Sequence, residues 1–139
     1  MKRKVSDYSG VGILMILIGI LVGTPLLFFF FYPQDTRYVW AFLIPSLSSV
    51  LLGITVCFCR RKSEVSSDWR TSRRLSSHTV LFAWLWGVLI GALPFLFGKQ
   101  LTFVQSLFEA VSGWTTTGLS TMDVSKTPMI ALFHRSFMQ

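Results

Sequence analysis

Acidic residues are scarce in this chain, which has only six Asp and Glu side chains among its 139 residues. Charged residues of both signs make up 14% of the sequence, roughly half of their usual share in soluble domains. Apolar residues, by contrast, account for 52%. So few charges cannot cover the surface of an ordinary soluble domain, and the composition instead indicates a protein whose main solvent is lipid.

Groups that usually carry catalysis or bind metals are also few. Cys57 and Cys59 form a Cys-x-Cys pair, but no second ligand pair stands at a metal-binding spacing. His78 and His134 are far apart in the sequence, and we expect them to be boundary residues rather than ligands. The sequence has no phosphate-binding glycine loop, nucleophile elbow or zinc-binding His-Glu motif. We therefore expect no enzyme activity and no cofactor in this chain.

The sequence does contain three long apolar runs, at residues 11–32, 38–59 and 79–98. Each has about 20 residues, which as a helix crosses roughly 30 Å of hydrocarbon. The first run is too long for a secretory signal, and no small-residue cleavage site follows it. We predict three membrane-spanning helices, and we expect Pro25 either to kink the first of them or to end its regular part.

The distribution of basic residues indicates how these helices are oriented. Basic residues gather within residues 1–10 and 60–78, whereas the short connection 33–37 carries only Arg37. The positive-inside rule therefore places the N-terminus and the 60–78 loop in the cytoplasm. The same basic residues are expected to contact anionic lipid, and no RNA- or DNA-binding motif beside them supports a nucleic-acid partner.

The segment after the third run differs from the first three. Residues 101–113 favour a helix that is too short to cross a bilayer, and Thr102 and Gln105 have capping-box spacing at its start. The polar residues 114–121, which include three consecutive threonines and Gly118, follow at once. This order predicts a half-membrane helix that leads into an extended polar strand.

A polar strand within the membrane must lie inside protein or along a water-filled path, because unpaired carbonyl groups are too costly in lipid. Carbonyl oxygens that turn toward one axis replace the water around a dehydrated cation, and Gly118 permits the backbone angles that this requires. Threonine hydroxyls add further oxygen ligands. The short helix also points the negative end of its dipole toward the position of this cation. The segment therefore indicates a cation path.

Residues 108–120, Phe-Glu-Ala-Val-Ser-Gly-Trp-Thr-Thr-Thr-Gly-Leu-Ser, resemble the first pore loop of the Trk/Ktr/HKT superfamily of potassium transporters. Residues 91–95 look like the end of the helix that leads to this loop, and residues 133–139 look like the start of the next helix. The two additional N-terminal runs resemble the Trk-type membrane subunit more than the Ktr type. Trp114 and Leu119 depart from the usual residues without removing an oxygen ligand.

The resemblance implies an all-α integral membrane protein for potassium uptake. In such a fold, two N-terminal helices precede a potassium-channel-like unit of helix, pore loop and helix, and the last helix starts within residues 128–139. Thr127 and Pro128 have the residue types of an N-cap and a first helical turn at its start. The filter carbonyls implied by the resemblance are those of Thr116, Thr117, Gly118 and Leu119, with K+ at Thr116 and Thr117. The residues implied to support the filter are Thr115, Ser120, Glu109 and Trp114.

Members of this superfamily carry four such loops around one pore, and they usually form homodimers with a cytoplasmic nucleotide-binding regulatory ring. This sequence has one loop and stops at Gln139, within the predicted last helix. One quarter of a filter cannot enclose an ion, so we expect the N-terminal part of a longer transporter. Its partners would be membrane lipid, the remaining pore repeats, a second copy and the regulatory subunit. The alternative is a small or degenerate membrane interaction protein without transport activity.

Charged residues near the loop allow several interpretations. Glu109 either supports the filter from behind or reaches water at an outer vestibule. Asp123 either raises the local cation concentration or is a solvated loop carboxylate. Arg135 is expected near the outer interface with its charged end in water. The apolar residues expected to pack against neighbouring helices are Phe103, Leu107, Phe108 and Val111.

Overall fold

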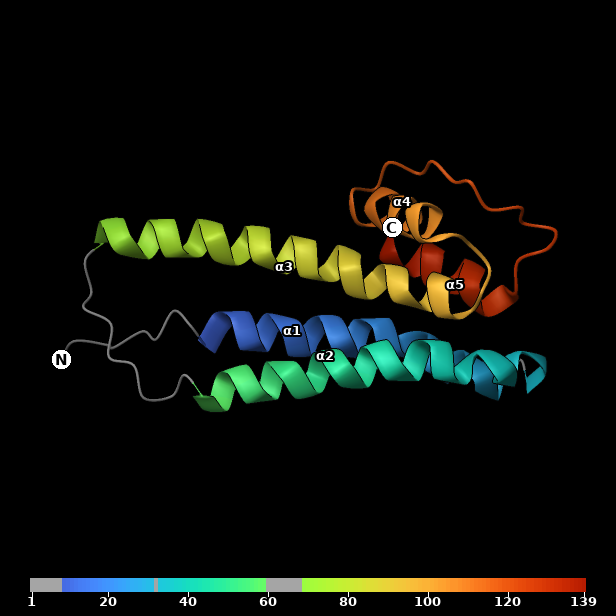
Figure 1. Ribbon diagram of the computed structural model, residues 1–139, viewed down its shortest axis with the longest axis horizontal. Coiled ribbons are helices and arrows are strands. Elements are labelled where there is room, and N and C mark those ends of the chain that lie inside the picture. Colours follow the sequence, from blue (N-terminus) through green and yellow to red (C-terminus); the bar gives the residue numbers. More distant parts are fainter. Residues whose placement is uncertain (1–8, 32, 60–68) are drawn as a thin grey trace.

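The computed structural model describes residues 9–31, 33–59 and 69–139, and these residues form helices with no strand among them. The α-helices are α1 (Ser9–Gly23), α2 (Val39–Cys59), α3 (Trp69–Phe97), α4 (Phe103–Trp114) and α5 (Met129–Met138). The first three are long and run side by side, and α4 and α5 lie beside one end of α3 (Figure 1). The prediction of an all-α fold is confirmed for this part of the chain.

Three segments of the described chain are long and apolar enough to cross a membrane, at Gly10–Leu27, Thr36–Cys59 and Ser77–Phe97. Their outer faces carry large apolar side chains; Leu51 of α2, for example, is 61% exposed. Contiguous apolar surface of this kind is rare on soluble monomers and suits contact with lipid. The protein is therefore a multi-pass membrane protein.

The first predicted span, residues 11–32, is not one continuous α-helix. α1 ends at Gly23 and a 3-10 helix, η1 (Thr24–Phe30), follows. Pro25 has no N–H group to donate to the carbonyl of Leu21, one helical turn earlier, and the hydroxyl of Thr24 donates to that carbonyl instead (2.7 Å). The connection that follows contains a second 3-10 helix, η2 (Pro33–Tyr38).

α3 begins at Trp69, so the prediction of a loop up to residue 78 was wrong for residues 69–78. Basic residues in this segment were interpreted as loop signals, but arginine is a good helix former and lets a helix continue beyond the hydrocarbon. The remainder of the predicted loop, residues 60–68, and residues 1–8 of the predicted cytoplasmic N-terminus lie outside the described residues.

Small residues allow α1 and α2 to pack closely. A Cβ atom added to Gly19 of α1 would lie 2.9 Å from the carbonyl oxygen of Ser46, and one added to Gly53 of α2 would lie 2.7 Å from the carbonyl oxygen of Gly12. Neither position has room for a side chain. Close backbone approach at small residues is a common basis of helix association in membranes, where water does not drive apolar side chains together.

A buried hydrogen-bond chain joins α3 to this helix pair. The indole Nε1 of Trp86 on α3 donates to Ser49 Oγ on α2 (2.9 Å), and Ser49 Oγ donates to the carbonyl of Met15 on α1 (2.7 Å). Ser49 has no exposed surface. Because no water is present at this depth to replace these bonds, the chain fixes α3 against α1 and α2.

We expect Ser49→Ala to lower the free energy of unfolding by about 1–2 kcal/mol, because it leaves the indole N–H of the partly buried Trp86 without its acceptor. Thermal unfolding of the purified protein in detergent, followed by circular dichroism, measures the change. Ser48→Ala is the matched control, because that hydroxyl donates within its own helix to the carbonyl of Pro45 (2.9 Å). Equal losses in the two variants would contradict the role assigned to the interhelical chain.

Candidate functional site

α4 begins with the predicted capping box. The Oγ1 atom of Thr102 accepts a hydrogen bond from the N–H of Gln105 (3.4 Å), and Oε1 of Gln105 accepts from the N–H of Thr102 (3.0 Å). The two bonds satisfy donors that the first helical turn would otherwise leave unpaired. Thr102 is therefore the N-cap, and the helix starts at Phe103.

The C-terminal end of α4 lies at half the depth of the apolar span of α3. Added Cβ atoms at Gly87 and Gly91 of α3 would approach the indole of Trp114 to 3.3 Å and 3.0 Å. Gly87 is the middle residue of the span Ser77–Phe97. α4 therefore enters from the end of the bundle where α3 stops, and it ends midway along the span, as Figure 1 shows.

The segment after α4, residues 115–128, returns without regular secondary structure. The N–H of Thr117 donates to the carbonyl of Ser112 (3.0 Å) near the end of α4, whereas the hydroxyl of Thr121 donates to Glu109 (3.0 Å), nearly one turn earlier. These contacts move back toward the start of the helix as the chain advances. The segment therefore runs antiparallel to α4 along one of its sides.

The predicted strand at residues 114–121 is absent from this described segment. Trp114 is the last residue of α4, and no neighbouring strand offers a partner. Two residues also have left-handed backbone angles that a strand excludes, with φ +55° at Thr116 and φ +80° at Gly118. Glycine enters this region without steric cost, whereas threonine does so only when its surroundings impose it.

The four predicted filter residues lie together at the end of this segment that adjoins α4, and all four are exposed: Thr116, Thr117, Gly118 and Leu119. Among the described residues, no donor contacts the carbonyl oxygens of Thr116, Thr117 and Gly118. Lipid cannot solvate carbonyl groups at this depth.

Leu119 differs from the other three predicted filter residues. Its carbonyl oxygen accepts hydrogen bonds from the hydroxyl of Ser112 (2.6 Å) and from Nη2 of Arg135 (3.0 Å). Both lone pairs are thereby engaged with the protein. The role of the Leu119 carbonyl is corrected accordingly: it anchors the segment to α4 and α5 instead of facing an ion.

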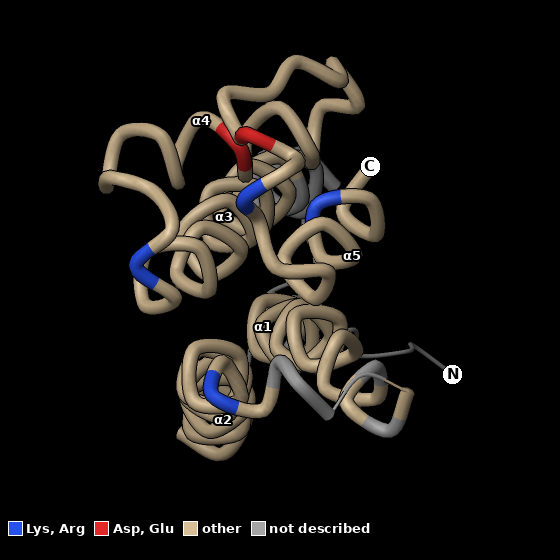
Figure 2. Tube along the Cα trace, turned by 90° about the vertical axis from the view of Figure 1, so that its right-hand side faces the viewer, with Lys and Arg blue, Asp and Glu red and all other residues tan. Residues whose placement is uncertain are grey.

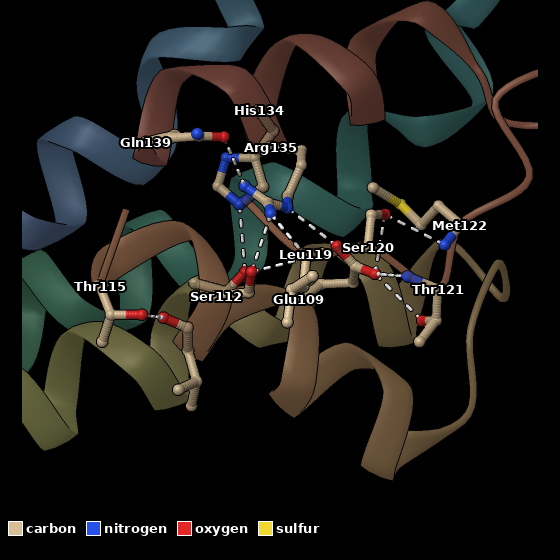
Figure 3. Close-up of polar contacts among 12 residues, drawn as sticks. Glu109, Ser112, Thr115, Leu119, Ser120, Thr121, Met122, His134, Arg135 and Gln139 are labelled. Atoms are coloured by element: carbon tan, nitrogen blue, oxygen red, sulfur yellow. Dashed lines mark hydrogen bonds and ion pairs between the residues drawn. The ribbon is translucent and has the colours of Figure 1, made fainter. Parts of the chain in front are cut away.

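The carboxylate of Glu109 joins α4 to the returning segment from a fully buried position. Its Oε1 atom accepts from the N–H of Thr121 and from the hydroxyls of Ser120 and Thr121, the latter two at 3.0 Å. Its Oε2 atom lies 2.8 Å from Nε of Arg135 on α5. The interpretation in which Glu109 reaches water is therefore excluded. Figure 3 shows its carboxylate between the returning segment, at Ser120 and Thr121, and the guanidinium of Arg135.

Arg135 completes this anchor. It is only 6% exposed, so the prediction that it extends to water at the interface was wrong. Besides Glu109, its guanidinium donates to Ser112 Oγ (3.1 Å), to the carbonyl of Leu119 (3.0 Å) and to Oε1 of Gln139 (3.3 Å). Sequence reasoning named Arg135 but missed its role in this anchor. The available signal was an arginine within an apolar helix, which in a membrane requires an acidic partner.

His134, expected at a boundary, is instead fully buried. Its ring lies 5.2 Å from those of Phe42 on α2 and Phe95 on α3, centroid to centroid, and Nε2 lies 3.1 Å from the carbonyl oxygen of Gly91. Because α5 follows the returning segment directly, this packing fixes the outgoing side of the loop to the long helices. His78 is exposed on α3, in agreement with its expected boundary position.

The apolar residues of α4 divide between two faces. Leu107 and Val111 pack against the cluster that includes Ala92, as predicted. Phe103 and Phe108 are 58% and 41% exposed, so the predicted packing against neighbouring helices is not made with helices of the described chain. The cause is that α4 lies against α3 on one side and has no helix of the described chain covering the opposite side.

The loop before α5 is held by its own side chains. Oδ1 of Asp123 accepts from the hydroxyl (2.6 Å) and the N–H (3.1 Å) of Ser125, and Oδ2 lies 3.4 Å from Nζ of Lys126. These donors, Ser125 first, hold the pKa of the Asp123 carboxyl below its usual value, so it stays ionised on the surface. Thr127 donates to the carbonyl of Asp123 (2.7 Å), and Pro128 takes the N-cap position predicted for Thr127.

Comparison with curated proteins finds relatives among membrane transporters. The chain is 30% identical over 125 residues to an uncharacterized cation transporter of Methanocaldococcus jannaschii, covering 88% of this chain and 25% of that protein. It is 29% identical over 128 residues to the Trk system potassium uptake protein TrkG of Escherichia coli K12, covering 90% and 25%. With TrkH of the same strain it shares 42% identity over 59 residues, covering 39% and 12%.

The chain therefore spans about a quarter of the length of the first two of these relatives. No family model matches it, and no solved structure matches it significantly.

Proposed function

Because this chain belongs to the family of the Trk potassium uptake proteins, we propose that it supplies one pore loop of a membrane transporter that takes up potassium ions. The names of its relatives describe potassium or cation transport, and none describes an enzyme. The proposal therefore concerns ion passage through a membrane and involves no chemical reaction.

The observation that carries the proposal is the set of three unpartnered carbonyl oxygens on residues 116–118, at the depth where α4 ends. A dehydrated K+ ion needs several oxygen ligands held in place, and backbone carbonyls supply them in potassium-selective filters. We assign the ion to the level of Thr116 and Thr117, and the carbonyl of Gly118 completes the row of three carbonyl oxygens. The C-terminal end of α4 adds a favourable dipole at the same level.

Four neighbouring residues hold this row in position. Glu109 and Ser120 bind the returning segment to α4, and the indole of Trp114 packs on the glycines of α3. Thr115 donates to the carbonyl of Val111 (2.8 Å), and its hydroxyl lies 2.7 Å from that of Thr117. These contacts hold the segment against two helices before any ion binds. Ion binding therefore does not have to supply the free energy for ordering this segment.

One loop forms only one side of an ion path. We propose that three further loops of a longer protein complete it around the same axis, and that the exposed side chains of Phe103 and Phe108 face those repeats. A second copy, a cytoplasmic nucleotide-binding regulatory subunit and a cytoplasmic N-terminus are further parts of this proposal. The basic residues around positions 1–10 and 60–78 favour this orientation.

The test is rubidium uptake by Escherichia coli cells that lack their own potassium uptake systems and express the gene that encodes this chain. We expect growth on low potassium and a rubidium uptake rate at least roughly tenfold above that of the empty vector, equivalent to a barrier lowered by about 1.4 kcal/mol. A protein that is present in the membrane but gives no uptake would contradict the proposal and favour a membrane interaction protein.

A further inference from the structure

A second candidate site lies away from the pore loop, at the end of the bundle where α2 begins and α3 stops. It is a cavity of about 560 Å³. Figure 2 shows this end of the molecule facing the viewer, with Lys and Arg positions in blue. The side chains that characterise the cavity are those of Arg37, Tyr38, Trp40, Ile44, Phe97 and Lys99. None of them belongs to the proposed ion path.

The charge of this cavity is positive. Arg37 precedes α2 and Lys99 follows α3, so folding brings two cations from distant parts of the sequence to one place. No acidic residue is among the described residues that line the cavity. The guanidinium of Arg37 donates to the hydroxyl of Tyr38 (2.6 Å) and stacks over its ring, with 4.8 Å from Cζ to the centroid. The site therefore favours an anion.

The cavity also lies at the boundary of the membrane-spanning segments. The apolar span of α2 begins at Thr36, beside Arg37, and that of α3 ends at Phe97, two residues before Lys99. Both cations are thus at the level where lipid headgroups lie, and Trp40 has the side-chain type that is enriched there. Ile44 and Phe97 are 51% and 47% exposed and continue the surface into the apolar span.

The backbone at Lys99 shows that the fold itself does not require this lysine. Lys99 has φ +54° and ends α3 in a Schellman arrangement, in which its N–H donates to the carbonyl of Leu96 (3.0 Å) and the N–H of Gln100 donates to that of Phe95 (3.3 Å). Glycine is the usual residue at this left-handed position. For the backbone alone, a lysine is therefore less favourable here than glycine.

We propose that this cavity binds an anionic phospholipid. The phosphate lies between the guanidinium of Arg37 and the ammonium of Lys99, and an acyl chain lies along Ile44 and Phe97. Arg37 offers several N–H donors in a plane, and Lys99 adds a point charge, which together suit a phosphodiester. The apolar floor distinguishes a lipid from free phosphate, because a free anion would gain nothing from it. The inference holds in either orientation of the chain and does not depend on the transport proposal.

Native mass spectrometry of the purified, delipidated full-length protein tests this site with two lipids of identical acyl chains, phosphatidylglycerol and phosphatidylcholine. We expect phosphatidylglycerol to bind at least fivefold more tightly. Arg37→Gln and Lys99→Gly should each remove most of this preference. Lys99→Gly is the more informative variant, because it relieves the left-handed backbone and should fold at least as stably, which thermal unfolding checks.

The matched control is Lys126→Gln, which removes the same charge from an exposed lysine on the neighbouring loop that does not line this cavity. It should bind phosphatidylglycerol like the unmodified protein. Equal binding of the two lipids, or an unchanged preference in both Arg37→Gln and Lys99→Gly, would overturn the proposal. Displacement of phosphatidylglycerol by millimolar inorganic phosphate would also overturn it, because the acyl chain would then contribute nothing.

Discussion

Replacing Gly118 with Asp should reduce rubidium uptake by at least roughly tenfold, which corresponds to a barrier raised by about 1.4 kcal/mol or more. Gly118 is exposed, has φ +80°, and lies in the row of carbonyls to which we assign the ion. A carboxylate at this position would enter the ion path and bind cations too strongly for rapid passage. The measurement is the initial rate of uptake at equal amounts of protein in the membrane.

The substitution separates transport from folding. A Cβ atom at Gly118 would meet only Nε2 of Gln139, at 3.4 Å. The left-handed φ strains any side chain at this position, and Asp is among the residues that tolerate it best, so equal amounts of folded protein in the membrane are required for the comparison. Val124→Asp is the matched control, because this side chain is 68% exposed on the same loop, beyond the anchored segment. Uptake that stays normal in the Gly118→Asp protein would rule out the ion path at these carbonyls.

The helices were the most predictable part of this structure. The apolar run at residues 38–59 predicted α2, Val39–Cys59, nearly to the residue. In lipid, backbone groups must be paired within the segment, so a sufficiently long apolar run has few alternatives to a helix. That constraint weakens at Pro25, which removes one donor and ends the regular helix as one of the two expected outcomes there. It weakens also at residues 69–78, the misjudged element, where α3 continues beyond the hydrocarbon.

The site was only partly predictable. Gly118 was identifiable because glycine next to polar residues signals an unusual backbone, and Glu109 because a carboxylate in an apolar helix needs a partner. The partner itself was not identifiable by spacing, since Arg135 is 26 residues further on and reaches Glu109 only because residues 115–128 double back along α4. The hydrogen bonds from Ser112 and Arg135 to the carbonyl of Leu119 also form only because this segment doubles back along α4.

Removing one member of the buried ion pair should have the largest effect on stability. We expect Glu109→Gln and Arg135→Met each to lower the free energy of unfolding by about 3–5 kcal/mol, because each leaves an uncompensated charge away from water. Both side chains are nearly inaccessible, at 0% and 8% exposure. Thermal or denaturant unfolding in detergent measures the loss, and rubidium uptake should fall with it because the returning segment loses its attachment.

The double variant Glu109→Gln with Arg135→Met shows whether the charges act as a pair. It leaves no charge buried, so its loss of stability should be smaller than the sum of the two single losses by at least about 2 kcal/mol. Asp123→Asn provides the contrast, because Asp123 pairs with Lys126 on the surface at 3.4 Å, and its removal should not change the unfolding temperature measurably. Strictly additive losses at Glu109 and Arg135 would mean that each residue acts through its other hydrogen bonds. The returning segment would then be held by Ser112, Ser120 and Thr121 independently of the ion pair.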